Sequence, residues 1–125
     1  MERVTLTIPA PPPPGINRQD TMHWAARARL RTRWRELAYG AWLEAGRPVI
    51  DRPEVTVTLY YSTRRHRDTD NAAAAIKPII DGLKGHAWPG DDDAETITLL
   101  PIRMAVDAEH PRVEITLNRA SGGGS

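Results

Sequence analysis

The chain has 125 residues, of which 40% are hydrophobic and 26% charged, values near the average for a single globular domain. It contains no cysteine, which excludes disulfides, zinc–thiolate sites and thiol catalysis. No apolar run approaches the roughly 20 residues that span a bilayer, and the N-terminus lacks a signal-peptide core. The formal net charge of +1 predicts no strong general attraction to polyanions. We therefore expect one cytoplasmic domain with no membrane segment.

The first element is a predicted strand. Val4, Leu6 and Ile8 alternate with threonines, the period of two that is typical of a strand with one buried face. Pro9 and the run Pro11 to Pro14 end it, because proline donates no hydrogen bond to a sheet. Residues 15–18 read as a loop. The proline run has two interpretations, a ligand for a partner protein or a rigid exit from an edge strand, and we favour the second.

A helix is predicted from about His23 to Glu44, because apolar residues recur at spacings of three and four. It is rich in arginine: six arginines and a single acid, Asp20, lie between residues 18 and 35. This surface is either an ordinary solvated face or a rail for a nucleic-acid backbone, since the planar guanidinium suits phosphate oxygens. The candidate nucleic-acid-binding residues here are Arg18, Arg27, Arg31 and Arg35.

The remaining pattern predicts three more strands. Residues 55–61 alternate, residues 96–106 are strand-like but contain Pro101, and residues 113–117 alternate again. A second helix is expected between the first two of these strands. The order is β-α-β-α-β-β, an α+β (α/β) fold with one mixed four-stranded sheet packed by two helices. The domain is expected to cover residues 1–119, with residues 120–125 as a flexible Gly/Ser tail.

The candidate chemistry lies directly after the second strand. Arg64, Arg65 and Arg67 precede Asp68 and Asp70. If Asp68 and Asp70 are extended, their carboxylates lie on one face and suit Mg²⁺ or Mn²⁺.

The surrounding residues supply the rest of the expected site. Asn71 is expected to cap the helix that follows it. A third ligand is expected from the only other acidic cluster that qualifies, residues 91–93. Lys77 would hold a phosphate or orient the attacking water.

Each part of this pattern has a plainer interpretation. An Asp-x-Asp alone is common on loops, and three consecutive aspartates often form a solvated turn. A calcium-binding loop is excluded, because its glycine and its final glutamate would fall at Ala73 and Ile79. The combination of acids, arginines and a lysine is what favours metal-assisted phosphodiester hydrolysis.

The order of these residues resembles the signature of the RusA family of Holliday-junction resolvases. The resemblance rests on residues 67–71 (Arg-Asp-Thr-Asp-Asn), residues 77–83 (Lys-Pro-Ile-Ile-Asp-Gly-Leu), Gly85, Trp88 and the acidic run; it extends over roughly residues 4–117. It implies a small Mg²⁺-dependent homodimer that cuts four-way DNA junctions with paired nicks. It also implies that Asp68, Asp70 and one later aspartate hold the metal, with Lys77 as the catalytic lysine.

Two departures from the family pattern lead to specific expectations. The segment 72–76 is about three residues longer than the commonest family spacing. A helix begun at Ala72 would place Pro78 in its interior, at a cost of roughly 3 kcal/mol. We therefore predict a separate turn at 72–75, or a kink, and a regular helix over about 76–84. The acidic run has three aspartates where the family usually has two; Asp92 fits both possible alignments and is preferred over Asp93.

The leading hypothesis is thus a Mg²⁺-dependent nuclease for four-way DNA junctions, from a phage or prophage-like setting. The alternatives are a nuclease for flaps, forks or other branched DNA, and a DNA-junction-binding protein without catalysis. Because a four-way junction is approximately two-fold symmetric, a homodimer is the expected assembly. Trp34 and Trp42 are candidates for either its interface or the core.

Overall fold

The structure is a computed structural model, and it describes residues 2–64, 67 and 69–119. Its strands and helices follow one another as nine elements. They are β1 (Arg3–Ile8), α1 (Ile16–Gln19), α2 (Trp24–Glu44), β2 (Pro53–Tyr61), α3 (Thr69–Ala75), α4 (Lys77–Leu83), β3 (Thr98–Leu99), β4 (Arg103–Val106) and β5 (Arg112–Arg119).

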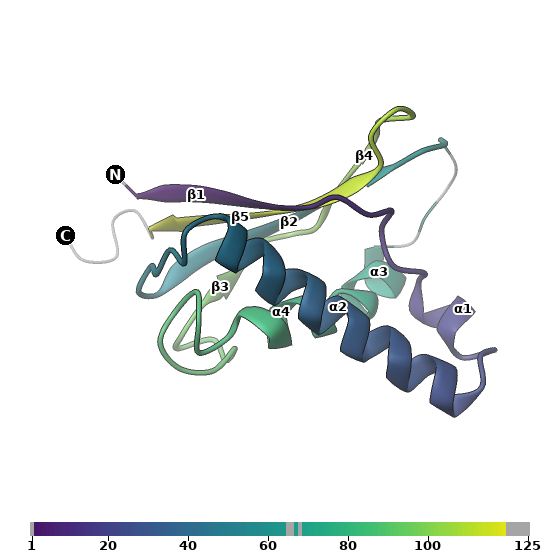
Figure 1. The fold of residues 1–125 in the computed structure, drawn as a ribbon, viewed down its shortest axis with the longest axis horizontal. Helices are drawn as coiled ribbons and strands as arrows, with labels where there is room; N and C mark the ends of the chain where they lie inside the picture. Colours follow the sequence, from purple (N-terminus) through teal and green to yellow (C-terminus); the bar gives the residue numbers. More distant parts are fainter. Residues whose placement is uncertain (1, 65–66, 68, 120–125) are drawn as a thin grey trace.

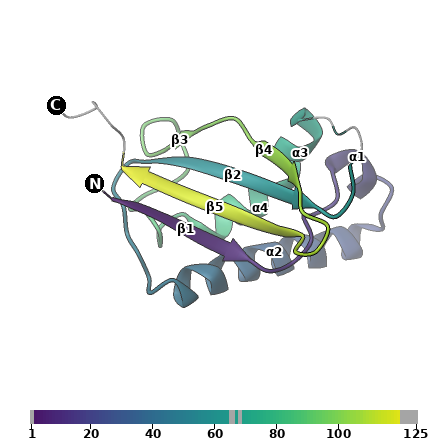
Figure 2. The same ribbon diagram turned by 90° about the horizontal axis from the view of Figure 1, so that it is seen from above.

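The strands form one mixed sheet in the order β1-β5-β2-β3, with β4 also paired to β2. β5 is antiparallel to both β1 and β2, whereas β3 and β4 run parallel to β2. The helices lie on one face of this sheet, as the edge-on and top views show together (Figures 1 and 2). The start of β1 and the end of β5 lie at one end of the domain, and α1 and α3 lie at the other (Figure 1).

The core lies between the sheet and the helices. Inward residues of three neighbouring strands meet in register, with Leu6 opposite Ile115 and Ile115 opposite Val57, all fully buried. From the helix layer, Trp34 and Trp42 of α2 are buried in the same cluster. Both tryptophans therefore belong to the core of the domain. Alternation with the threonines of β1 and β2 accounts for this one-sided burial.

The predicted strand count was wrong, and Pro101 explains the difference. The segment 96–106 forms two short strands, β3 and β4, rather than one. Proline cannot donate to a sheet, so the pairing with β2 is interrupted between them. Over the residues that the structure describes, the sheet therefore has five strands instead of four, while the broad expectation of a single α+β domain with one mixed sheet is confirmed. Within the described ranges, no helix is long and apolar enough to cross a membrane.

The helices differ from the prediction in number and agree in their main break. The long helix runs from Trp24 to Glu44 as expected, and His23 caps it by accepting a hydrogen bond from the Ala25 amide. The predicted loop at 15–18 is instead largely the short helix α1. The second predicted helix is two helices, α3 and α4, which meet at Ile76. The described residues thus form four helices instead of the two expected, and the expected interruption before Pro78 is confirmed.

Two glycines provide a matched test of the packing between α2 and α4. A Cβ on Gly82 of α4 would lie 2.4 Å from the carbonyl oxygen of Arg35 in α2, whereas a Cβ on Gly40 would meet nothing within 4 Å. We expect Gly82→Ala to lower the free energy of unfolding by about 1–3 kcal/mol, because the backbone of α2 must move. Gly40→Ala is expected to raise it by about 0.5–1 kcal/mol. Urea unfolding of both variants checks this; equal effects would contradict the close helix contact.

Candidate active site

Asp70 lies in the first turn of α3 and is exposed. A carboxylate is favoured there, because the first turn of a helix carries partial positive charge. The expectation that this stretch is extended is therefore wrong for Asp70. Asp68 and Arg65 lie outside the described residues, so the predicted pairing of Asp68 with Asp70 stays a prediction.

The junction at Ile76 sets the position of Lys77. The Ile76 amide donates to the Ala72 carbonyl at 3.1 Å and ends α3, while the Ile76 carbonyl accepts from the amides of Ile79 and Ile80 at 2.9 and 3.3 Å. Pro78 has no amide to donate, and it lies in the first turn of α4, where none is needed. Lys77 is consequently the first residue of a new helix, despite the long alanine segment before it.

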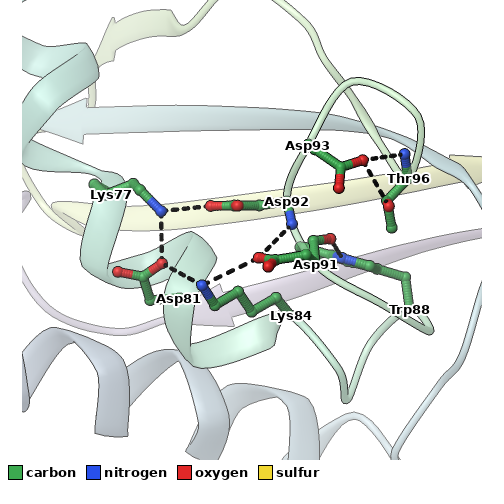
Figure 3. A network of polar contacts seen from close by, with 8 residues as sticks. All are labelled: Lys77, Asp81, Lys84, Trp88, Asp91, Asp92, Asp93 and Thr96. Atoms are coloured by element: carbon green, nitrogen blue, oxygen red, sulfur yellow. Dashed lines mark hydrogen bonds and ion pairs between the residues drawn. The ribbon is translucent and has the colours of Figure 1, made fainter.

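Lys77 joins α4 to the acidic loop that follows it. Its ammonium contacts the Asp92 carboxylate, and it also donates to Asp81 at 2.7 Å (Figure 3). Lys84 lies on the other side of Asp81, 3.4 Å from its carboxylate and 3.2 Å from that of Asp91. Two lysines thus alternate with three carboxylates in one network. The structure brings Lys77 to Asp92, the residue preferred from the sequence.

The loop that carries Asp92 is held by its neighbours. The indole of Trp88, which is fully buried, donates to the Asp91 carbonyl at 2.7 Å. Asp93 accepts at one oxygen from the Thr96 amide and hydroxyl, at 3.0 and 2.8 Å (Figure 3). The same oxygen accepts from the Glu95 amide at 3.0 Å. Asp93 therefore shapes the turn, while Asp92 faces Lys77. This arrangement favours Asp92 over Asp93 as the candidate metal ligand.

The charges in this network are set by the contacts between its members. The hydrogen bond from Lys77 lowers the pKa of the Asp92 carboxyl below its usual value. The hydrogen bonds to Asp81 and then to Asp92 raise the pKa of the Lys77 ammonium. At neutral pH Asp92 is therefore ionised, which is the form that binds metal, and Lys77 is a cation. Within the part of the chain that is described, which lacks Asp68, no three acidic or histidine side chains form a group that could hold a metal ion.

Comparison of the chain with protein-family models and with curated proteins gave no match. The candidate site therefore rests on its own residues and geometry. Asp70 and Asp92 each carry carboxylate oxygens, the type of donor that suits Mg²⁺ or Mn²⁺ rather than a softer metal.

The predicted arginines have different environments. Arg31 and Arg35 are exposed on α2, and Arg18 is exposed on α1. Arg27 is half-buried and lies 3.8 Å from Asp20. Of the predicted arginines on α2, Arg31 and Arg35 are thus more exposed than Arg27.

The arginines before the acidic motif behave differently from one another. Arg64 is exposed. Arg67 is half-buried: its guanidinium lies 3.6 Å from the centroid of the Tyr61 ring, and it donates to the Thr63 carbonyl at 3.1 Å. Arg67 therefore packs back on the end of β2, a cation–π contact that leaves its charge near the start of α3.

Two residues of the lysine–carboxylate network and one residue of α2 were not singled out from the sequence. Asp81 and Lys84 complete the lysine–carboxylate network. Asp81 lies four residues after Lys77, and Lys84 lies three residues after Asp81, so their helical spacing was the available signal. Trp24 is the third: it begins α2 with 69% of its surface exposed, beside the ring of His23. An exposed tryptophan on an arginine-rich helix is typical of surfaces that stack on nucleobases.

Asn71 has a different role from the predicted one. It lies inside α3, and its side-chain oxygen accepts a hydrogen bond from the Asn17 amide of α1 at 2.7 Å. It therefore satisfies a free amide at the start of α1 rather than at the start of its own helix. The side chain ties the proline-rich loop and α1 to the segment that carries Asp70.

Proposed function

We propose that this chain is a Mg²⁺-dependent endonuclease that cuts branched DNA, with four-way junctions as its leading substrate and RusA-like chemistry. The observation that carries the proposal is the contact of the Lys77 ammonium with the Asp92 carboxylate. These residues come from α4 and from a loop 15 positions later. Their contact supports a site in which a carboxylate that can bind a divalent cation lies beside an ammonium that can stabilise charge on a phosphate.

The residues have distinct roles in this proposal. Asp70 and Asp92, together with Asp68, would hold Mg²⁺ through carboxylate oxygens. When bound, the ion supplies a more acidic water and stabilises negative charge on the phosphate. Lys77 donates to a phosphate oxygen, because an ammonium has only hydrogens to give. Asp81 positions Lys77 from the next turn of α4.

DNA affinity would come from the arginine-rich side of α2. Arg31 and Arg35 are exposed there at a spacing of four, so they lie on one side of the helix. Each phosphate contact by such a residue releases counterions and strengthens binding in a salt-dependent way. Trp24, at the start of the same helix, offers a stacking surface for a base. A homodimer would present two copies of this surface to the two-fold symmetry of a four-way junction.

The proposal is tested by cleavage of a synthetic four-way junction and of a linear duplex that contains the same arm sequences. We expect Mg²⁺-dependent cuts in the junction strands, little cutting of the duplex, and junction binding that persists in EDTA. Preferred cutting of flaps or forks would identify the substrate as another branched DNA. Binding without any cutting in Mg²⁺ or Mn²⁺ would show a junction-binding protein without catalysis. Equal cutting of junction and duplex would overturn the structure-selective assignment.

A further inference from the structure

A cavity of about 590 Å³ lies between the proline-rich loop and α3. The proposed hydrolysis makes no use of it. The cavity is open on one side and bordered by the proline-rich loop, the start of α1, the end of β2 and one side of α3. Its lining residues are Pro12, Pro13, Pro14, Gly15, Arg18, Leu59, Tyr61, Arg67, Asn71, Ala72 and Ala75. The volume falls within the roughly 300–1,000 Å³ that is usual for small-molecule sites.

The outer wall of this cavity is held in place by specific contacts. Asn71 binds the Asn17 amide, and Gly15 packs so tightly on Asn71 that a Cβ would lie 2.3 Å from its side-chain nitrogen. Gln19, with only 6% of its surface exposed, donates to the Pro14 carbonyl at 2.8 Å. The ring of each lining proline, Pro12 to Pro14, fixes its backbone φ. The proline run is thus one wall of a preformed cavity, a role beyond that of ending β1.

The lining of the cavity combines an apolar floor with cationic groups. Leu59, Ala72 and Ala75 are almost completely buried and form the floor. Arg18 and Arg67 supply guanidinium groups, and none of the described lining residues is acidic. A ligand with a planar, largely apolar ring and an anionic group matches this combination. A deoxynucleotide has both parts, since its base fits an apolar slot and its phosphate pairs with arginine.

The position of the cavity relates it to the acidic motif. Asn71 and Ala72, which line it, directly follow Asp70 in α3. Successive residues of a helix are about 100° apart, so Asp70 projects from a different side of α3 than the cavity residues do. Asp70 and the cavity residues are therefore neighbours along α3 that lie on different sides of this short helix. Nucleotides at a branch point are the least costly to remove from the stack, because their pairing is already interrupted.

We propose that this cavity holds one unpaired deoxynucleotide of the DNA strand, extruded next to the phosphate at the acidic site. The inference rests on the proposed function, because it places the extruded nucleotide beside the bond to be cut. The cavity would then select DNA in which a nucleotide is free to leave the stack. Intact duplex would be excluded by the cost of unpairing.

The direct test is the chemical shift of backbone amides in metal-free buffer, titrated with deoxynucleoside 5′-monophosphates. Inorganic phosphate and deoxyribose 5-phosphate are the controls for binding through the phosphate alone. We expect shifts over residues 15–19 and 69–75 with the nucleotides only. Arg18→Ala should weaken this binding roughly tenfold, the low end for a charged hydrogen bond. Arg33→Ala removes an equal charge from the exposed surface of α2, outside the cavity, and should leave binding unchanged.

Several outcomes would overturn the inference: no shifts, shifts confined to α2, or equal shifts with inorganic phosphate. A second measurement tests extrusion in DNA. The fluorescence of a junction with 2-aminopurine beside the branch point should rise when the protein binds it in EDTA. Arg18→Ala should reduce this rise more than Arg33→Ala does. Unchanged fluorescence at every labelled position of a bound junction would defeat extrusion. Junction cleavage without nucleotide binding would overturn only the proposed role of the cavity. Nucleotide binding without cleavage would overturn only the nuclease assignment.

Discussion

The Asp92→Asn protein is expected to lose Mg²⁺-dependent cleavage of the four-way junction while it still binds the junction in EDTA. Asparagine keeps the shape of the side chain and removes the charge that a hard cation requires. Loss of an outer-shell partner of a metal ligand typically costs 10–100-fold, so loss of a ligand should lower kcat by more than about 100-fold. Weaker Mn²⁺ binding, followed by electron paramagnetic resonance, should accompany the loss.

The neighbouring aspartates are matched controls for this substitution. Asp91 has a side chain that is 64% exposed and pairs with Lys84, so Asp91→Asn should leave cleavage nearly unchanged. Asp93→Ala removes the acceptor of the turn that ends at Thr96, and should lower the free energy of unfolding by about 0.5–2 kcal/mol. Its folded form should still cleave. Full activity of Asp92→Asn, or lost cleavage in a stable Asp93→Ala protein, would contradict the assignment of Asp92.

The parts of this protein that were predictable from sequence are those with local causes. The alternation in β1 and β5 and the helical spacing in α2 each specify an element without knowledge of its neighbours. The break before Pro78 follows in the same way from the missing amide of one residue. Pro101 was recognised as an interruption, but its result, two short strands parallel to β2, depends on the partner strand.

The parts that were not predictable depend on contacts between distant segments. α1 is only four residues long, and its first turn is satisfied by Asn71 from more than 50 residues away. The different roles of Asp92 and Asp93 likewise follow from the way Trp88 and Thr96 fix the loop. No periodicity in the chain encodes these contacts. The approach of Lys77 to Asp92 belongs to the same class, and the spacing between them left it undecided.

Lys77→Met is the second substitution from which a large loss is expected, because it removes the cation that faces Asp92. The pKa of Lys77 is raised by its hydrogen bonds to Asp81 and Asp92, so the side chain is an ammonium at neutral pH and cannot act as a general base in this arrangement. Its role in the proposed reaction is to stabilise charge on the phosphate. Removal of one such donor typically lowers kcat by about 10²–10³-fold. The acid limb of the pH–rate profile should move to higher pH in Lys77→Met, because the hydrogen bond that lowers the pKa of Asp92 is lost.

Two further variants separate the charge of Lys77 from its positioning. Asp81→Asn keeps Lys77 but weakens the contact that orients it, and should lower kcat by about 10–100-fold. Lys84→Met removes a lysine that contacts the same Asp81 but lies against Asp91 rather than Asp92, and should have little effect on kcat. If Lys84→Met and Lys77→Met lowered kcat equally, cleavage would depend on the whole lysine–carboxylate network rather than on the Lys77–Asp92 pair. Wild-type kcat in Lys77→Met would remove Lys77 from the reaction and leave the carboxylates alone as the site.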